Sequence, residues 1–394
     1  MVLADERDDR RLRRFWSVIY VVLGGLLRRG FRLRLDPMPE PEGAAIILCN
    51  HPSMLDPLFV ALSSKQQFYF LGTESLYQKG LRSRLMKYWL GPIAKQKGSV
   101  SAGAVMTMLR YLRAGRRVCI FPEGIASCNG EGNPIVESTG KLVRSAGATL
   151  ITYRLEGAYL ARPKWSKKNR RGPIFGVVAG VYAPEKLRAM KPREINALIH
   201  RDLFLNDYTW QRARRISYPG PRRAEGIENL LYLCPQCARI GTLRGTKNEI
   251  HCGCGLRVEI GEDAFLHGGP YSTLVDWDRA QNEAFSQRLQ SEPDLVLSDE
   301  GASLYTVAEQ HRPQLLLTAA LRMGPHTLSV GDRSFPLDEV TGMALHGRNY
   351  FVFFHNEIHY EVKTLKTRAA YSAAKYLLMY RARSAAAGSS AGIS

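Results

Sequence analysis

The sequence lacks an apolar run long enough to cross a bilayer as a helix. Its longest run, Phe15–Leu27, has 13 residues, whereas a spanning helix needs roughly 20. No small-residue cleavage site follows this run, and Arg28 and Arg29 come at once, so we do not expect a cleaved signal peptide. The chain has 394 residues and is 45% hydrophobic, which is enough for two or three domains with cores of their own.

Acidic residues are scarce in the first part of the chain. The formal net charge is +19, and residues 1–228 hold 39 Lys and Arg against 19 Asp and Glu. Residues 229–394 hold 16 against 17, so they are close to neutral. A basic surface attracts polyanions, either nucleic acid or an anionic lipid surface. Charge alone does not decide between these two partners. Its uneven distribution places the basic surface in residues 1–228.

Cysteine is rare, and its seven copies are unevenly placed. An odd count without a secretory signal argues for a reducing compartment and for metal ligation, against a disulfide framework. Two pairs, Cys234-Pro235-Gln236-Cys237 and Cys252-Gly253-Cys254, resemble the two knuckles of a zinc ribbon, although the second has one residue fewer than usual. Four thiolates leave no open position on zinc, so we expect a structural ion. There are two alternatives. His251 could replace one cysteine as a ligand, or the four cysteines could be free or disulfide-linked.

The run Phe15–Leu27 is flanked by arginines on both sides. As a helix it would carry one broad apolar face, formed by Phe15, Trp16, Ile19, Leu23, Leu26 and Leu27. Basic side chains beside that face can reach lipid phosphates, which is typical of an interfacial helix. The alternative is an ordinary helix packed on the core. We therefore expect a peripheral or monotopic protein that binds an anionic membrane surface on its cytoplasmic face.

Apolar strands alternate with helical segments from residue 41 to residue 228, which predicts an α/β domain with a mixed sheet covered by helices. The expected strands are Ala44–Cys49, Gln67–Leu71, Pro92–Lys95, Arg117–Phe121, Ala148–Leu155 and Ile174–Tyr182. The expected helices are Ser53–Ser63, Arg82–Trp89, Ser101–Arg113 and Pro192–Arg214.

The remaining segments give the other predicted boundaries. Residues 1–40 form the basic membrane-interface segment, 229–260 the zinc-ribbon-like segment, and 384–394 a disordered tail. Residues 261–383 form a small β-rich module, whose expected strands lie between two helices. This module resembles pleckstrin-homology domains. Its expected helices are Leu274–Leu289 and Ala369–Arg381, and its expected strands are Leu295–Leu297, Gln314–Leu317, Thr327–Val330, Tyr350–Phe354 and Ile358–Val362.

The segment Asn50–Asp56 carries the first candidate chemistry, because it directly follows an expected strand. His51 at the strand end with Asp56 five residues later can pair the carboxylate with one imidazole nitrogen across a turn. The carboxylate would fix the tautomer, and the other nitrogen would accept a hydroxyl proton. An Asp that caps a helix beside a surface His is the ordinary alternative. Glu123 in Phe121–Gly124 follows another strand, where a carboxylate faces the ligand-binding edge of an open sheet.

Together, His51–Asp56 and Phe121–Gly124 resemble the first and third motifs of the glycerolipid acyltransferases that make phosphatidic acid. The resemblance covers roughly residues 40–215. It implies that His51 is the general base, Asp56 its partner, and Glu123 with Gly124 part of the acceptor site.

The resemblance also implies a phosphate-binding motif, which corresponds to Gly91–Lys97. Lys95 and Lys97 stand there where the family commonly has an Arg, and a Lys cannot make the bidentate contact of a guanidinium. The family commonly continues its third motif with Thr-Arg-Ser, whereas this chain reads Ile125-Ala126-Ser127. These departures leave the acceptor less well defined than the catalytic residues.

These observations predict a membrane-associated O-acyltransferase. It would move a fatty acyl group from acyl-CoA or acyl carrier protein to a lysophospholipid or related lipid hydroxyl. The alternative is a non-catalytic lipid-sensing scaffold that recruits partners through its zinc-ribbon and β modules. The near-neutral charge of residues 229–394 and the absence of an aromatic stacking motif beside the basic clusters argue against a nucleic-acid partner.

Overall fold

The computed structural model describes residues 14, 16–18, 20–22, 24–73, 93–95, 102–307, 313–346, 350–364 and 373–386. The chain divides into two compact units, each described here by itself. The first unit comprises residues 1–96, 100–164 and 170–219, and the second comprises 97–99, 165–169 and 220–394. The segments 229–260 and 261–383 therefore fall within one unit.

The first unit is built on a seven-stranded mixed sheet in the order β1-β7-β6-β2-β5-β3-β4. Its strands β6, β2, β5, β3 and β4 run parallel to one another, and β7 is antiparallel to β6. The predicted mixed α/β fold is confirmed. The strands are β1 (Leu33–Leu35), β2 (Ala45–Cys49), β3 (Tyr69–Thr73), β4 (Ile93–Lys95), β5 (Arg117–Ile120), β6 (Thr149–Glu156) and β7 (Ile174–Tyr182).

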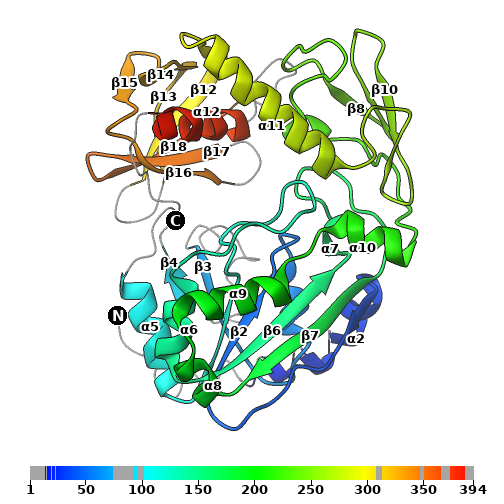
Figure 1. Cartoon of the computed structure of the whole chain (residues 1–394), viewed down its shortest axis with the longest axis vertical. Coiled ribbons are helices and arrows are strands. Elements are labelled where there is room, and N and C mark those ends of the chain that lie inside the picture. Colours follow the sequence, from blue (N-terminus) through cyan, green and yellow to red (C-terminus); the bar gives the residue numbers. More distant parts are fainter. Residues whose placement is uncertain are drawn as a thin grey trace. The chain divides into compact units, whose positions relative to one another are not determined.

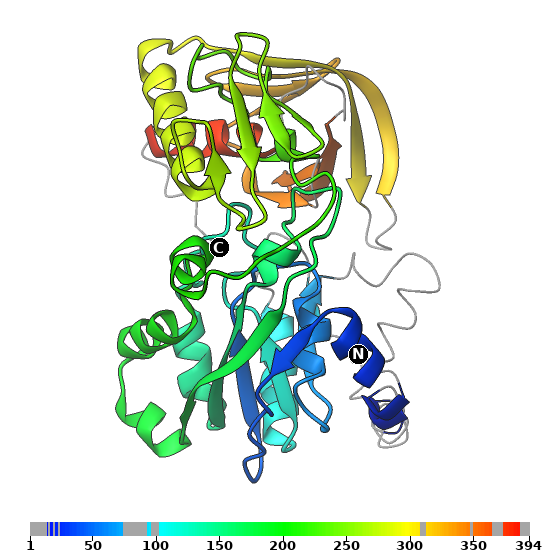
Figure 2. The same ribbon diagram turned by 90° about the vertical axis from the view of Figure 1, so that its right-hand side faces the viewer.

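Helices cover both faces of this sheet, and for this reason every residue of β2 is buried. On one face Ile46 and Leu48 pack in a core with Met108 of α5 and Ile195 and Ile199 of α9. The helix α2 lies on the opposite face (Figures 1 and 2), and Phe59 of α3 packs edge-on against Phe31, which directly follows α2. The helices are α2 (Gly24–Gly30), α3 (Asp56–Ala61), α5 (Ala102–Arg113), α6 (Thr139–Ala146), α7 (Ala158–Ala161), α8 (Pro184–Ala189), α9 (Pro192–Leu203) and α10 (Asp207–Arg214).

The prediction of a single helix over Pro192–Arg214 is wrong, because the structure has two helices, α9 and α10. Phe204 takes an extended conformation at the end of α9. Asn206 then caps α10, since its side-chain oxygen accepts hydrogen bonds from the backbone N–H groups of Tyr208 and Thr209. A capping side chain of this kind starts a new helix and stops the previous one from continuing. The predicted helix Arg82–Trp89 lies outside the described residues.

The described residues of the N-terminal helical segment pack on the protein by one side. Trp16 is buried, its ring lies edge-on to that of Phe68, and its indole N–H donates to the Ser64 carbonyl. Four apolar side chains on the other side are 57–77% exposed, namely Val18, Val21, Val22 and Leu26. Sequence periodicity placed Trp16 and Leu26 on one face, whereas here they lie on different sides. No helix among the described residues has the length and apolarity to span a membrane.

The second unit begins with a four-stranded antiparallel sheet and continues through α11 into a seven-stranded sheet and α12 (Figure 1). The seven strands follow the order β15-β14-β13-β12-β18-β17-β16. The small sheet and the preceding short helix are η2 (Ile227–Asn229), β8 (Arg244–Thr246), β9 (Glu249–His251), β10 (Arg257–Ile260) and β11 (Leu266–His267). The rest are α11 (Leu274–Ser291), β12 (Leu297–Val307), β13 (Pro313–Met323), β14 (Thr327–Val330), β15 (Arg333–Pro336), β16 (Thr341–His346), β17 (Tyr350–His355), β18 (Ile358–Lys363) and α12 (Ala373–Ala386).

The predicted β-rich region with a terminal helix is confirmed, although its strands β11, β15 and β16 were missed and the predicted strand Leu295–Leu297 meets β12 only at Leu297. In β15 only Phe335 is buried, so Arg333–Pro336 shows no apolar alternation. In β16 the register shifts between Thr341 and Ala344, which interrupts the period of two on which strand recognition depends. The likeness to pleckstrin-homology domains stays a prediction.

Candidate active site

The candidate site lies where the parallel strands β2 and β5 end, at the same edge of the sheet. The chain leaves β2 at Cys49, turns through His51 and enters α3 at Asp56. The Nδ1 atom of His51 lies 2.8 Å from Oδ2 of Asp56. The backbone N–H of Ser53 donates to the same oxygen over 2.8 Å. With Nδ1 facing a carboxylate, a neutral ring carries its proton there, and Nε2 remains as the proton acceptor.

Asp56 is fully buried, whereas the His51 side chain is 15% exposed. Burial raises the pKa of Asp56, and the hydrogen bonds from His51 and Ser53 oppose this rise. The carboxylate is therefore shielded from water behind the imidazole, and the imidazole is the part of the pair that a substrate can reach.

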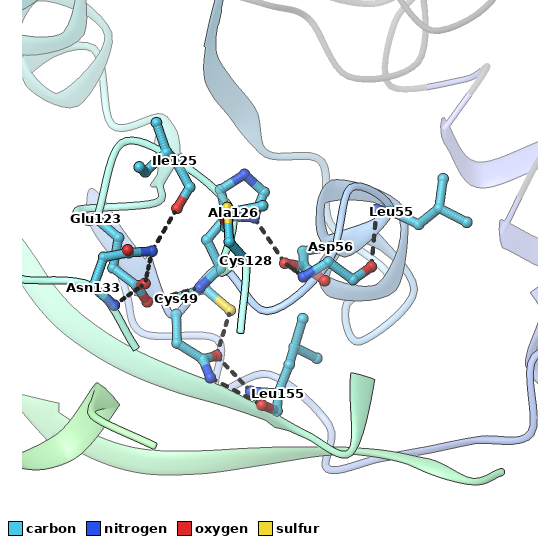
Figure 3. A network of polar contacts seen from close by, with 12 residues as sticks. Cys49, Leu55, Asp56, Glu123, Ile125, Ala126, Cys128, Asn133 and Leu155 are labelled. Atoms are coloured by element: carbon cyan, nitrogen blue, oxygen red, sulfur yellow. Dashed lines mark hydrogen bonds and ion pairs between the residues drawn. The ribbon is translucent and has the colours of Figure 1, made fainter. Parts of the chain in front are cut away.

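Glu123 reaches back from the end of β5 and holds the main chain of His51. Its Oε1 accepts a hydrogen bond of 2.9 Å from the backbone N–H of His51. Its Oε2 accepts from the backbone N–H and from the side-chain amide of Asn133, over 2.7 and 3.1 Å. Figure 3 shows Asn133 against Glu123, with Asp56 across the network. Burial raises the pKa of Glu123, and these N–H donors oppose the rise.

The turn after β5 also fixes the other side of His51. The backbone N–H of Ser127 donates to the His51 carbonyl over 2.8 Å, and the Phe121 ring stacks on the imidazole with centroids 4.5 Å apart. Gly124 makes this turn possible, because its φ of 73° lies in the left-handed region and its N–H donates to the Phe121 carbonyl. The two motifs therefore form one hydrogen-bonded assembly around the imidazole.

Two residues of this assembly were missed from the sequence. The side-chain amide of Asn50 pairs with both backbone groups of Leu155 at 2.7 and 2.9 Å, so it extends the contact between β2 and β6 up to His51. The signal that could have identified Asn50 in the sequence is its position next to His51. Asn133 lies ten residues beyond Glu123 in an irregular segment, and no pattern in the sequence marked it.

The predicted phosphate-binding residues are described only in part. Lys95 ends β4, where its backbone pairs with Thr73, and its side chain lies outside the described part of the chain. Lys97 lies outside the described residues altogether. Their contact with an acceptor phosphate stays a prediction.

Six of the seven cysteines form two groups, and Cys128 belongs to neither. Cys49 and Cys119 are buried in the sheet, and burial raises the pKa of both thiols, which makes them poor nucleophiles. In the second unit the sulfur atoms of Cys234, Cys237, Cys252 and Cys254 all lie within 4.8 Å of one another. His251, the alternative ligand, is not part of this described group.

A solved structure and a family model resemble parts of this chain. A crystal structure of the 1-acyl-sn-glycerophosphate (LPA) acyltransferase PlsC from Thermotoga maritima matches with a TM-score of 0.42 and 15% sequence identity, over 54% of this chain and 84% of that one. A structural likeness this distant does not identify a family, so the family comparison depends on the sequence model. That model, Acyltransferase, matches residues 33–156, which include β1 to β6 and both candidate motifs. Residues 33–156 therefore form a segment similar to the Acyltransferase family.

Proposed function

We propose that this protein is a membrane-surface O-acyltransferase that moves a fatty acyl group from a thioester to the hydroxyl of a lysophospholipid or a related lipid. The observation that carries the proposal is the 2.8 Å contact between His51 Nδ1 and Asp56 Oδ2 in a chain whose residues 33–156 are similar to this family. A buried carboxylate behind a partly exposed imidazole is the arrangement that a general base requires.

The reaction needs no nucleophile from the protein. The acceptor hydroxyl gives its proton to Nε2 of His51 while its oxygen attacks the carbonyl carbon of the thioester. The carbon–sulfur bond then breaks, the acyl group remains on the acceptor as an ester, and the imidazolium returns its proton to the leaving thiolate. Asp56 stabilises the imidazolium between these two transfers. Acyl-CoA and acyl carrier protein both supply such a thioester.

Glu123 and Asn133 act as positioning residues in this scheme. Both oxygens of the Glu123 carboxylate already accept hydrogen bonds from protein N–H groups. The predicted contact between Glu123 and the acceptor hydroxyls would have to share those oxygens. We therefore assign to Glu123 first the task of holding the His51 backbone, and we assign to Asn133 the task of orienting Glu123.

The membrane surface is the source from which the acceptor would come. The described N-terminal helix presents Val18, Val21, Val22 and Leu26 to solvent, and exposed Arg14, Arg29, Arg32 and Arg34 lie in the same segment. Exposed apolar side chains beside arginines favour an anionic lipid surface, because the apolar groups enter the acyl boundary while the guanidinium groups bind phosphates.

The test is product analysis with the purified full chain. The protein is incubated with acyl-CoA or acyl-loaded carrier protein and a panel of lysophospholipids and simpler glycerolipids in anionic vesicles, and products are identified by mass spectrometry. We expect a new ester with at least one donor and acceptor, and none with His51→Ala. Binding of lysolipids without turnover under any of these conditions would overturn the proposal and favour the lipid-sensing scaffold.

A further inference from the structure

Four cysteines in the second unit converge from two tight turns of the small antiparallel sheet. The first turn lies ahead of β8, where the backbone of Leu233 pairs with Ile240 across Cys234 and Cys237. The second turn joins β9 to β10 and carries Cys252 and Cys254. Only 14 residues separate Cys237 from Cys252, and the two turns together surround one point with sulfur.

The spacing of the sulfur atoms matches a tetrahedral metal site. The Sγ atoms of Cys234 and Cys254 are 3.7 Å apart, and those of Cys237 and Cys252 are 3.8 Å apart. Zinc–sulfur bonds of about 2.3 Å in a tetrahedron place their sulfur atoms about 3.8 Å from one another. A disulfide would require about 2.05 Å. We propose that Cys234, Cys237, Cys252 and Cys254 bind one Zn²⁺ ion that holds the two turns together.

The surroundings of the cluster suit thiolates. The backbone N–H groups of Gln236 and Cys237 are directed at the sulfur of Cys234. The hydroxyl of Thr242 lies 3.2 Å from the sulfur of Cys252, to which it can donate once that thiol has lost its proton. N–H and O–H donors around a metal-bound sulfur stabilise its negative charge and fix the direction of its lone pairs.

The backbone of both turns is adapted to this convergence. Ala238 has a φ of 54° directly after Cys237, and its N–H donates to the carbonyl of Cys234. Gly255 has a φ of 100° directly after Cys254, and its N–H donates to the carbonyl of Cys252. A left-handed residue costs free energy when it is Ala. The metal offsets that cost, since the turn orients Cys234 and Cys237 toward the same point.

The first turn is also connected to α11 within the same unit. The side-chain amide oxygen of Gln281 accepts from the backbone N–H of Tyr232, and the indole of Trp277 donates to the carbonyl of Leu233. Gln281 is itself buried and also donates to the carbonyl of Leu230. Ordering of this turn by zinc therefore orders the chain that α11 contacts, and the effect of the ion extends beyond the small sheet.

The first experiment measures metal content. Full-length protein, purified under reducing conditions without an affinity tag that binds metals, is analysed by inductively coupled plasma mass spectrometry. We expect one zinc per chain, released in proportion as a mercurial reagent titrates the thiols. Cys234→Ser should lower the zinc content to half or less, whereas Cys128→Ser, the control outside the cluster, should keep it. Metal-free protein, or one iron per chain, would overturn the proposal.

The second experiment keeps the proposal testable if Cys234→Ser is poorly folded. Hydrogen exchange is followed in wild-type protein before and after removal of zinc by a chelator. Residues 232–243 and 250–257 should lose protection at least tenfold, and residues 274–281 of α11 should lose it to a smaller degree. Restored protection on adding zinc back supports the proposal, and identical exchange with and without the chelator contradicts it.

Discussion

The carboxylate of Glu123 accepts a hydrogen bond of 2.9 Å from the backbone N–H of His51, 72 residues earlier in the chain. The Ser127 N–H donates to the His51 carbonyl, so both backbone groups of the histidine are fixed by the segment that follows β5. A general base must be held in a narrow range of positions for proton transfer. In the proposed mechanism, the segment from Phe121 to Ser127 supplies that positioning for His51.

Substitution of Asn133 tests this relationship. Asn133→Ala removes the side-chain hydrogen bonds to Glu123 and to the Ile125 carbonyl while the backbone N–H remains. Asn133→Asp keeps the shape and places a second carboxylate beside Glu123. We expect kcat to fall several-fold in the first variant and at least tenfold in the second, with little change in the KM of the acceptor. Steady-state kinetics with the acceptor found active provides the measurement.

Asn196→Asp is the matched control for these variants. Asn196 also donates through its side chain to a backbone carbonyl, that of Glu137, and it lies on α9 outside the His51 assembly. Its kinetics should stay near wild type. A rise in acceptor KM with unchanged kcat in Asn133→Asp would contradict the positioning role and favour direct contact between Glu123 and the acceptor.

Two substitutions test the proposed proton transfer. His51→Ala should abolish acyl transfer, since the proton acceptor is lost. Asp56→Asn should lower kcat by about a thousandfold or more, because the imidazole loses the partner that fixes its tautomer. The control is His200→Ala, which removes a histidine that stacks on Phe204 away from the pair. Circular dichroism should be unchanged in all three, and wild-type turnover in His51→Ala would end the proposed mechanism.

The sequence was sufficient for the part of the site that depends on strand ends. Five fully buried residues mark β2, and a His and a Glu after two such strands must meet when the strands are parallel neighbours. The functions of Asn50 and Asn133 depend on the groups from other segments of the chain that the fold places within hydrogen-bond distance of them. Such partners are set by tertiary packing, and no local pattern encodes them.

The same limit explains the errors in the secondary structure. The break between α9 and α10 depends on one capping side chain, Asn206, within a segment that otherwise has helical periodicity. In the N-terminal helix, Trp16 was grouped with Leu26 by helical periodicity. The structure separates them because Trp16 finds partners in Phe68 and Ser64, whereas Leu26 is 69% exposed.

The exposed side of the N-terminal helix should govern membrane binding. Val21 and Val22 are 77% and 66% exposed, so charges placed there disturb no core contact. Because burying each valine contributes roughly 1.5–3 kcal/mol, the double substitution Val21→Asp with Val22→Asp should weaken binding to anionic vesicles at least tenfold. Vesicle co-sedimentation at low and at raised salt measures this effect, and raised salt should weaken the binding of wild type as well.

Leu315→Asp with Leu316→Asp is the control for this pair. These two residues are 52% and 38% exposed on β13, in the second unit. Their substitution by Asp makes the same change of net charge as the valine pair and removes a comparable area of exposed apolar surface. Equal loss of vesicle binding in both double variants would show an effect of net charge alone, and unchanged binding of the helix variant would place the membrane contact elsewhere.

Asp207, a fully buried carboxyl at the start of α10, should make stability depend on pH. Burial raises its pKa well above the ordinary value, assisted by the charges of Asp56, Glu156 and Glu123, although the N–H of Gly157 donates to it over 3.1 Å. A folded state with a raised pKa binds its proton more tightly than the unfolded chain does. Its contribution is therefore most favourable at low pH and is lost as pH rises from about 4 through the raised value.

Asp207→Asn removes this titration while its amide oxygen can still accept from Gly157. The variant should gain stability relative to wild type as pH rises from about 4 through the raised pKa of Asp207, because only wild type loses the contribution of the bound proton. Urea unfolding of both proteins at several pH values measures the difference, and exposed Glu185→Gln on α8 is the control that should show no such trend. A constant or shrinking difference over this range would mean that Asp207 stays ionised in the folded protein because the Gly157 N–H and its surroundings compensate for burial.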